Sequence, residues 1–129
     1  YGFAKQTARL AQLAHIASVL VDDNDYDDND VQLVQSLVGQ LHQALVLVLD
    51  QQMKDALVFD GKFGGIVSTD GLLDNQADFG NGRYNDHHFH YGYLLYAAAV
   101  MGKLNMTFIE EYGDAVDAIM YDIAYNKNG

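Results

Sequence analysis

The chain has 129 residues, half of them hydrophobic, which suits one domain or a part of one. Its net charge of −11, from 18 acidic and 7 basic residues, repels nucleic acid and anionic lipid, so we expect no nucleic-acid partner. Cysteine is absent, which excludes disulfides and thiolate metal sites from this sequence. No apolar run approaches the roughly 18 residues of a membrane span, and residues 1–5 lack the apolar core of a signal peptide, so we expect no membrane partner.

Apolar residues three and four apart predict two long helices in the first half of the chain. The first is predicted over residues 3–21, with an apolar stripe of Leu10, Leu13, Ala14, Ala17, Leu20 and Val21. The second is predicted over residues 31–52, with Asn29 or Asp30 as its N-cap. It is apolar on all sides at residues 44–49, which indicates burial on several faces.

The segment between these helices, residues 22–30, contains six Asp, whose mutual repulsion predicts a solvated turn. A calcium site is the alternative, because Asp23, Asp25 and Asp27 alternate as in an EF-hand loop. The glycine and the bidentate glutamate that complete the EF-hand pattern are missing, so the composition favours the solvated turn.

Residues 53–85 form a long glycine-rich segment that contains six of the 12 glycines and can hold a short β-hairpin. Residues 66–69 are predicted as a strand that is closed by Asp70 and Gly71. Two glycines follow Phe63, and their small size would let a ligand approach the backbone closely. Because the segment leads directly into a polar cluster, we favour a functional loop over a mobile surface loop.

Two further helices are predicted, over residues 86–104 and 107–125. The first of them has a packing face of small residues, which predicts close helix contact: Ala97, Ala98, Ala99 and Gly102. The second starts with a capping box formed by Thr107 and Glu110. The predicted fold class is all-α, with antiparallel helix pairs.

Residues 84–96 combine one acid with three histidines and several tyrosines at the start of the third helix. Asp86 and His90 lie four residues apart on one helix face, and His87 shares the next face with Tyr91. The first hypothesis is acid catalysis by Asp86, which must then stay protonated to donate a proton to a leaving oxygen. Burial by surrounding aromatic rings favours the protonated acid, whereas the helix N-terminus and a charged His90 favour the anion.

Other interpretations of this polar cluster remain open. Asp86, His87 and His90 could chelate a metal ion, although the His-Glu-x-x-His pattern of zinc hydrolases is absent. The chain could also be a non-catalytic carbohydrate-binding module or a structural helical module. In the simplest case the cluster is a helix start with satisfied polar caps.

The same residues show a family resemblance. Residues 78–100, Asp-Phe-Gly-Asn-Gly-Arg-Tyr-Asn-Asp-His-His-Phe-His-Tyr-Gly-Tyr-Leu-Leu-Tyr-Ala-Ala-Ala-Val, closely resemble the signature of glycoside hydrolase family 81, the endo-β-1,3-glucanases. The similarity extends to residues 62–72 and to Tyr1-Gly2, and therefore covers nearly the whole chain. It implies an inverting hydrolase of β-1,3-glucan, such as laminarin, curdlan or fungal cell-wall glucan, that acts outside the cell or at the cell wall.

The resemblance also implies how the chain is organised and which residues form its site. Residues 1–129 would be a fragment of a single helical catalytic domain, an (α/α)6 toroid whose remainder is the partner of this chain, without a cofactor or metal. Because such a fragment lacks partner helices, the second and fourth predicted helices would expose apolar faces that promote association or partial disorder. Asp86 matches the general acid, and His90 matches a cleft residue important for activity. The residues expected to bind sugar are Tyr84, Asn85, His87, Phe63 and Tyr93, with Phe63 in the place of the usual Trp.

One departure from the family pattern concerns the catalytic pair. An inverting glycosidase needs a second carboxylate roughly 6.5–9.5 Å from the acid, to activate water on the opposite sugar face. The resemblance places that glutamate in a later motif, which this sequence does not reach. Glu110 and Glu111 instead fall in the first turn of the fourth predicted helix, where they suit capping and dipole roles. We therefore expect this chain alone to lack normal glucanase activity.

Overall fold

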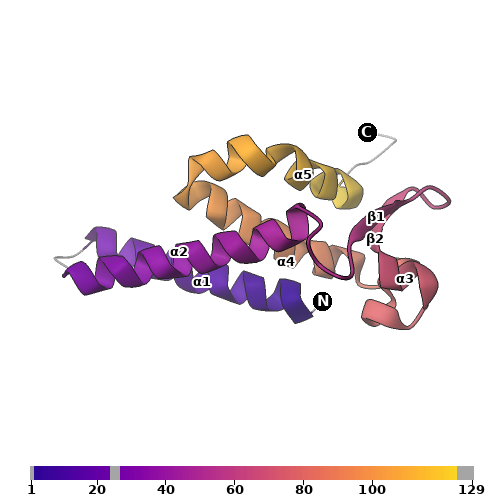
Figure 1. Ribbon diagram of the computed structural model, residues 1–129, viewed down its shortest axis with the longest axis horizontal. Coiled ribbons are helices and arrows are strands. Elements are labelled where there is room, and N and C mark those ends of the chain that lie inside the picture. Colours follow the sequence, from indigo (N-terminus) through magenta and orange to yellow (C-terminus); the bar gives the residue numbers. More distant parts are fainter. Residues whose placement is uncertain (1, 24–26, 125–129) are drawn as a thin grey trace.

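The computed structural model describes residues 2–23 and 27–124 (Figure 1). Within these residues the elements follow in the order α1 (Gly2–Asp23), α2 (Asp28–Leu49), β1 (Leu57–Asp60), β2 (Gly65–Ser68), α3 (Thr69–Leu73), η1 (Ala77–Arg83), α4 (His87–Leu104) and α5 (Met106–Ala124). The predicted all-α class with a small hairpin is confirmed. Asp25 of the calcium alternative, the predicted helix end at residue 125 and the residues after it lie outside the described part of the chain.

The four predicted long helices are present as two antiparallel pairs, α1 with α2 and α4 with α5 (Figure 1). Helix α1 packs most extensively against α4 and α2, and α4 also packs against α5. The hairpin, α3 and η1 gather at one end of the helices, beside the start of α4 (Figure 1). This arrangement places the segment before α4 at one tip of the molecule.

The buried face of α1 matches the predicted stripe only in part. Ala14 is buried and Leu10 packs against the core, as predicted, but Leu13 and Leu20 are 58% and 50% exposed. The other buried residues of α1 are small: Thr7, Ala8 and Ala11. Helix α4 contributes Ala97 and Ala98 to the same core. Small side chains allow two helices to approach closely, so this contact buries the narrow face of α1 and leaves Leu13 and Leu20 outside it.

Three predicted helix boundaries are wrong because other residues provide the caps. Asp27, not Asn29 or Asp30, caps α2: its carboxylate accepts backbone N–H groups at 2.8 and 3.1 Å, and these bonds lower the pKa of Asp27. Helix α2 ends at Leu49 instead of residue 52, because Gln51 adopts a left-handed conformation (φ 58°).

The predicted capping box at Thr107 is also wrong. The side chain of Asn105 accepts the backbone N–H of Thr107 at 3.1 Å, and α5 therefore begins at Met106. An Asn before the first helical residue is a favoured N-cap, because its short side chain reaches the free N–H groups of the first turn.

Residues 53–85 are more regular than predicted. Strands β1 and β2 pair antiparallel, with Leu57 opposite Ser68 and Asp60 opposite Gly65, so residues 61–64 form the turn. The predicted closure of the strand at Asp70 and Gly71 is wrong. These residues belong to α3, which is capped by the Ser68 hydroxyl that accepts the Gly71 N–H at 3.1 Å.

The four long helices share one hydrophobic core, and much apolar surface stays exposed around it. Fully buried side chains at its centre include Leu41, Leu45, Met101 and Phe108. Exposed apolar residues occur on α2 and α5, as predicted, and also on α1: Leu13, Ile16, Leu20, Val31, Leu33, Leu47, Ile109 and Met120. Of residues 44–49, which were expected to be buried on several faces, Leu45 and Val48 are buried and Leu47 is 40% exposed, while the others are partly buried. That this surface promotes association stays a prediction.

The expectation that no segment resembles a membrane span needs one correction. Among the described residues, α2 (Asp28–Leu49) is long and apolar enough to cross a membrane by length and composition alone. Core helices of globular proteins meet the same criterion, and α2 packs its buried residues against α1, α4 and α5.

Candidate active site

Asp86, which was expected as the first residue of the helix or its N-cap, is the N-cap residue of α4, and its side chain is exposed. It adopts a left-handed conformation (φ 49°, ψ 27°), and its carboxylate makes no capping hydrogen bond to α4. Its backbone C=O accepts the His90 N–H at 3.0 Å, which is the first bond of the helix. The expected burial of Asp86 by neighbouring aromatic rings is not present, since the left-handed turn directs the carboxylate outward.

The backbone before α4 is unusually strained. Four non-glycine residues between positions 78 and 86 have positive φ: Asp78, Phe79, Tyr84 and Asp86. Such conformations cost on the order of 1–3 kcal/mol each and persist only where the surrounding structure enforces them, so they concentrate at functional sites. The strain is an independent indication that this segment forms a site.

Close backbone contacts and one side-chain amide hold the strained segment in place. A Cβ on Gly82 would lie 1.9 Å from the Gly71 carbonyl oxygen, so only glycine permits this contact between η1 and α3. The Asn85 amide donates to the Phe79 C=O at 2.9 Å and reaches Oδ2 of Asp86 at 3.5 Å. Asn85 therefore ties the left-handed turn to the candidate acid.

Two surface hollows adjoin this segment. One has a volume of about 520 Å³ and is lined by Phe63, Leu72 and Tyr84, and the other has a volume of about 750 Å³ and is lined by Phe79, Tyr84 and Asp86 among others. They share three lining residues: Asn75, Arg83 and Tyr84. We call the two together the trough. Both volumes lie within the roughly 300–1,000 Å³ of typical ligand sites.

Tyr84 lies at the junction of the two hollows and is fixed from several sides. Its hydroxyl donates to Asp60 at 3.4 Å, and its ring meets Phe63 edge-on at 6.3 Å. Burial and the neighbouring Asp60 carboxylate raise the pKa of Tyr84. The ring rests on Gly65, where an added Cβ would lie 2.3 Å from it. The structure thus brings Phe63, Tyr84, Asn85 and Asp86 to one trough.

His87 is buried and does not line the trough. Its Nε2 lies 2.5 Å from Oδ2 of Asp122 on α5, and its ring is packed between Tyr84 and Tyr91 at 4.9 and 4.6 Å. Oδ1 of Asp122 also accepts the Ile66 N–H of β2 at 2.8 Å. The expected contact of His87 with substrate is therefore not supported: this side chain joins α4, α5 and the hairpin beneath the trough.

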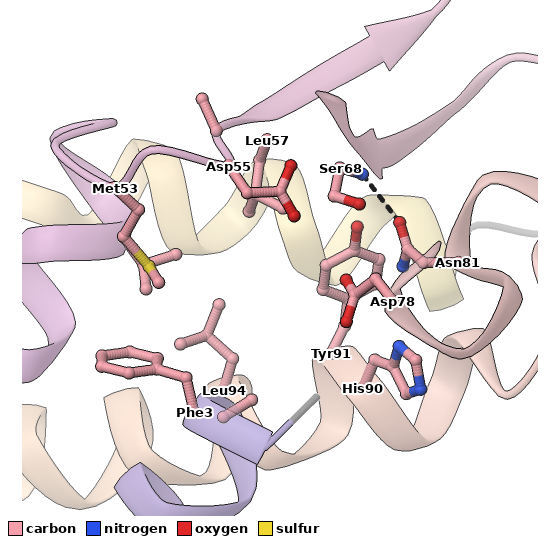
Figure 2. A pocket seen from close by; sticks show the side chains of 13 residues that line it. Phe3, Met53, Asp55, Leu57, Ser68, Asp78, Asn81, His90, Tyr91 and Leu94 are labelled. Atoms are coloured by element: carbon pink, nitrogen blue, oxygen red, sulfur yellow. Dashed lines mark hydrogen bonds between the residues drawn. The ribbon is translucent and has the colours of Figure 1, made fainter. Parts of the chain in front are cut away.

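His90 lines a separate cavity of about 120 Å³, shown in Figure 2. Apolar side chains such as Phe3, Met53 and Leu94 form one side of this cavity. Its polar side includes Asp78, Ser68, Asn81, Tyr91 and His90, with the Asn81 side chain accepting the Ser68 N–H at 2.7 Å. Its volume lies well below the roughly 300–1,000 Å³ of typical ligand sites, so the cavity is too small for a sugar ring. Burial lowers the pKa of His90, although the Asp78 and Asp86 carboxylates oppose this shift.

The structure separates Asp86 and His90 although they are four residues apart. Asp86 faces the open trough and His90 the small cavity, with Phe79 meeting the His90 ring edge-on at 6.5 Å. The metal alternative has no support. Among residues 2–23 and 27–124, no three His, Cys, Asp or Glu side chains lie close enough together to hold a metal ion. Tyr93 is half-buried on α4 and lines neither hollow of the trough.

Several residues of the site escaped sequence reasoning. Asp60 and Asp122 were not expected as partners of Tyr84 and His87, because strand β1 and helix α5 bring them in from distant parts of the chain. Phe79 was not singled out either. The sequence offered one signal for Phe79, namely a bulky residue beside a glycine in a polar, glycine-rich segment. The left-handed backbone of Phe79 is visible only in the structure.

Comparison with known proteins gives consistent results. The sequence model of the glycosyl hydrolase family 81 C-terminal domain matches residues 1–129. The chain is 40% identical over 98 residues to the primary septum glucan endo-1,3-beta-D-glucosidase of Schizosaccharomyces pombe, covering 75% of this chain and 10% of that protein. It is 32% identical over 123 residues to a glucan endo-1,3-beta-D-glucosidase of Glycine max, covering 95% of this chain and 17% of the relative. The corresponding Thermobifida fusca enzyme is 32% identical over 130 residues, or 95% of this chain and 15% of its own length. The chain thus spans less than a fifth of each of these relatives.

Proposed function

Because the chain belongs to glycosyl hydrolase family 81, we propose that it forms part of the catalytic domain of a longer endo-β-1,3-glucanase. The substrate would be a β-1,3-glucan such as laminarin, curdlan or fungal cell-wall glucan, encountered outside the cell or at the cell wall, and the reaction would proceed with inversion. The observation that carries the proposal is the trough, which places Asp86 and exposed aromatic rings on one open surface.

Asp86 would act as the general acid that protonates the leaving glycosidic oxygen. Asp86 lines the trough, where a bound polysaccharide can reach it, but its exposure in this chain departs from the dry cleft that was expected for the acid. Protonation at working pH then requires that substrate and the rest of the catalytic domain exclude water from the trough. The neighbouring His90 does not oppose this, because its lowered pKa keeps the buried imidazole neutral at pH 7.

His90 would support the site from beneath as a neutral group under Phe79, rather than exchange protons with the sugar. Phe63, Tyr84 and Asn85 would bind the glucan along the trough: rings pack on the C–H faces of pyranoses, and amides bond their hydroxyls. The roles of His87 and Tyr93 would be indirect, since neither lines the trough.

The general base would lie outside this chain. Glu110 and Glu111 are in the first turns of α5, which starts where α4 ends. Helix α4 has 18 residues, and at about 1.5 Å per residue it separates them from Asp86 by roughly 25 Å. That separation far exceeds the roughly 6.5–9.5 Å between the two carboxyl groups of an inverting pair.

The role of Asp86 is tested by Asp86→Asn in the complete enzyme that contains this chain. We expect a loss of turnover on laminarin on the order of 10²–10⁴, with binding of the oligosaccharide retained. Asp114→Asn, an exposed acid on α5, is the matched control and should keep wild-type activity. Loss of binding with the chemistry intact would show that Asp86 has a structural role instead.

The requirement for a second carboxylate is tested with the isolated chain of 129 residues. We expect no release of reducing sugar from laminarin, because the activated water has no base. Reducing sugar released by this chain alone would contradict the proposal. The anomeric configuration of the first product of the complete enzyme, followed by NMR, distinguishes inversion from retention.

A non-catalytic glucan-binding module is the second candidate, and the exposure of Asp86 in this chain favours it. In that case laminarin would bind to the chain, and Asp86→Asn would change neither turnover nor affinity.

A further inference from the structure

Phe79 combines two unfavourable features. Its backbone is left-handed (φ 57°, ψ 30°), which is rare for a bulky residue, and its side chain is 63% exposed to solvent. Both features cost stability, through strain in the first case and through exposed apolar surface in the second. An exposed ring on a strained turn beside the trough is suited to contact a ligand.

The position of Phe79 is enforced from both sides. Its carbonyl accepts the Asn85 amide at 2.9 Å, and its ring meets the buried His90 ring edge-on at 6.5 Å. A Cβ on the adjacent Gly80 would lie 3.1 Å from Asn85, so the turn is tightly packed at this point. The ring is therefore pre-positioned before any ligand arrives, which lowers the entropy cost of binding.

The hollow in front of Phe79 has the composition of a sugar site. Its polar lining is built from planar amides and a guanidinium group, contributed by Asn75, Gln76, Arg83 and Asn85, with the Asp86 carboxylate at its edge. An aromatic face packs against the C–H surface of a pyranose, while amides and Arg can both orient its hydroxyls. Lipid or peptide ligands would be expected to need a wider apolar lining than the Phe79 and Tyr84 rings provide.

We propose that Phe79 is the stacking platform for one glucosyl unit in the subsite next to Asp86, a role that rests on the proposed glucanase function. Asn85 is the positioning residue of this subsite, because one amide contacts both the Phe79 carbonyl and the Asp86 carboxylate. The platform and the acid are thereby fixed in one short segment.

The test compares Phe79→Ala with Phe89→Ala in the complete enzyme. Phe89 is the matched control: it is 66% exposed, lies three residues after Asp86 and lines neither hollow of the trough. We expect Phe79→Ala to raise KM for laminari-oligosaccharides about tenfold with a smaller change in kcat, and Phe89→Ala to leave both unchanged. Phe79→Trp should restore the affinity.

Phe79→Gly separates binding from folding. Glycine adopts positive φ without strain, so this variant should melt at the same temperature as the wild type or higher and still lose affinity. Equal KM values for the Phe79→Ala and Phe89→Ala variants, in an enzyme that cleaves laminarin, would overturn the platform and leave the proposed function intact. A wild-type enzyme that neither binds nor cleaves β-1,3-glucan would overturn both.

Discussion

Removal of the Asp122 carboxylate should destabilise the chain far more than removal of an exposed acid that caps no helix. Asp122 accepts the Ile66 N–H at 2.8 Å and lies 2.5 Å from Nε2 of His87, and its side chain is 5% exposed. Asp122→Ala leaves both donors buried without an acceptor. Each such group costs about 1–3 kcal/mol, so we expect a loss of about 2–6 kcal/mol. That is a large share of the about 5–15 kcal/mol of a typical domain.

Asp122→Asn should destabilise the chain less than Asp122→Ala, because the amide keeps one of the two contacts of the carboxylate. The amide oxygen can still accept the Ile66 N–H, but the NH₂ group then faces Nε2 of His87 and forces its proton onto Nδ1. Nδ1 is buried without a hydrogen-bond partner in the structure, so one unpaired N–H remains at a cost of about 1–3 kcal/mol.

The assay is urea unfolding followed by far-UV circular dichroism, with the free energy of unfolding taken from linear extrapolation. Asp117→Ala, an exposed acid on the same helix, is the control and should stay within about 0.5 kcal/mol of the wild type. The reasoning is refuted if Asp122→Ala is no more destabilising than Asp117→Ala, or if Asp122→Asn costs as much as Asp122→Ala.

Three further predictions concern glycines and a buried histidine. Gly65→Ala should lower the free energy of unfolding by about 1–3 kcal/mol and shift the Tyr84 ring, because the new Cβ would lie 2.3 Å from that ring. Gly61→Ala is the control: its Cβ meets no atom within 4 Å, so its stability should be nearly unchanged in thermal melts of both variants. Gly39 lies in the interior of α2, and a Cβ added there would have open space around it. Gly39→Ala should therefore raise the free energy of unfolding by about 0.5–1 kcal/mol in urea titrations, and no gain would contradict this helix-propensity argument. Burial lowers the pKa of His90 below its usual 6.5, so below that pH the unfolded chain binds a proton that the folded chain does not, and stability rises with pH up to about 6.5. Unfolding measured across this range should show a smaller slope in His90→Gln, and an unchanged slope would exclude His90 as its source.

Residue spacing predicted the four long helices because each has an apolar face with a helical period. The same spacing did not predict which face of α1 is buried, since it ranks Leu13 above Ala11 by hydrophobicity. The face that packs is decided by how closely α4 can approach, and this depends on the small side chains of both helices. Helix ends were missed for a similar reason: several Asp and Asn residues compete for each cap, and tertiary structure selects one.

The candidate site was predicted in its position but not in its geometry. The cluster of polar residues located the start of α4 to within one residue of Asp86. It could not show that His87 turns inward, because its partner Asp122 is 35 residues away in the sequence. The left-handed residues before α4 were equally hidden, since Phe79 and Tyr84 have no local preference for that conformation.

The bond between Ile66 and Asp122 also has a consequence for the order of folding. The two residues are 56 positions apart, and Asp122 lies near the end of α5. During synthesis from the N-terminus, β2 and the start of α4 leave the ribosome well before their shared acceptor does, and the long loop must close before this contact forms. The contact that joins the hairpin, α4 and α5 beneath the trough is therefore expected to form late, after the helical pairs have assembled.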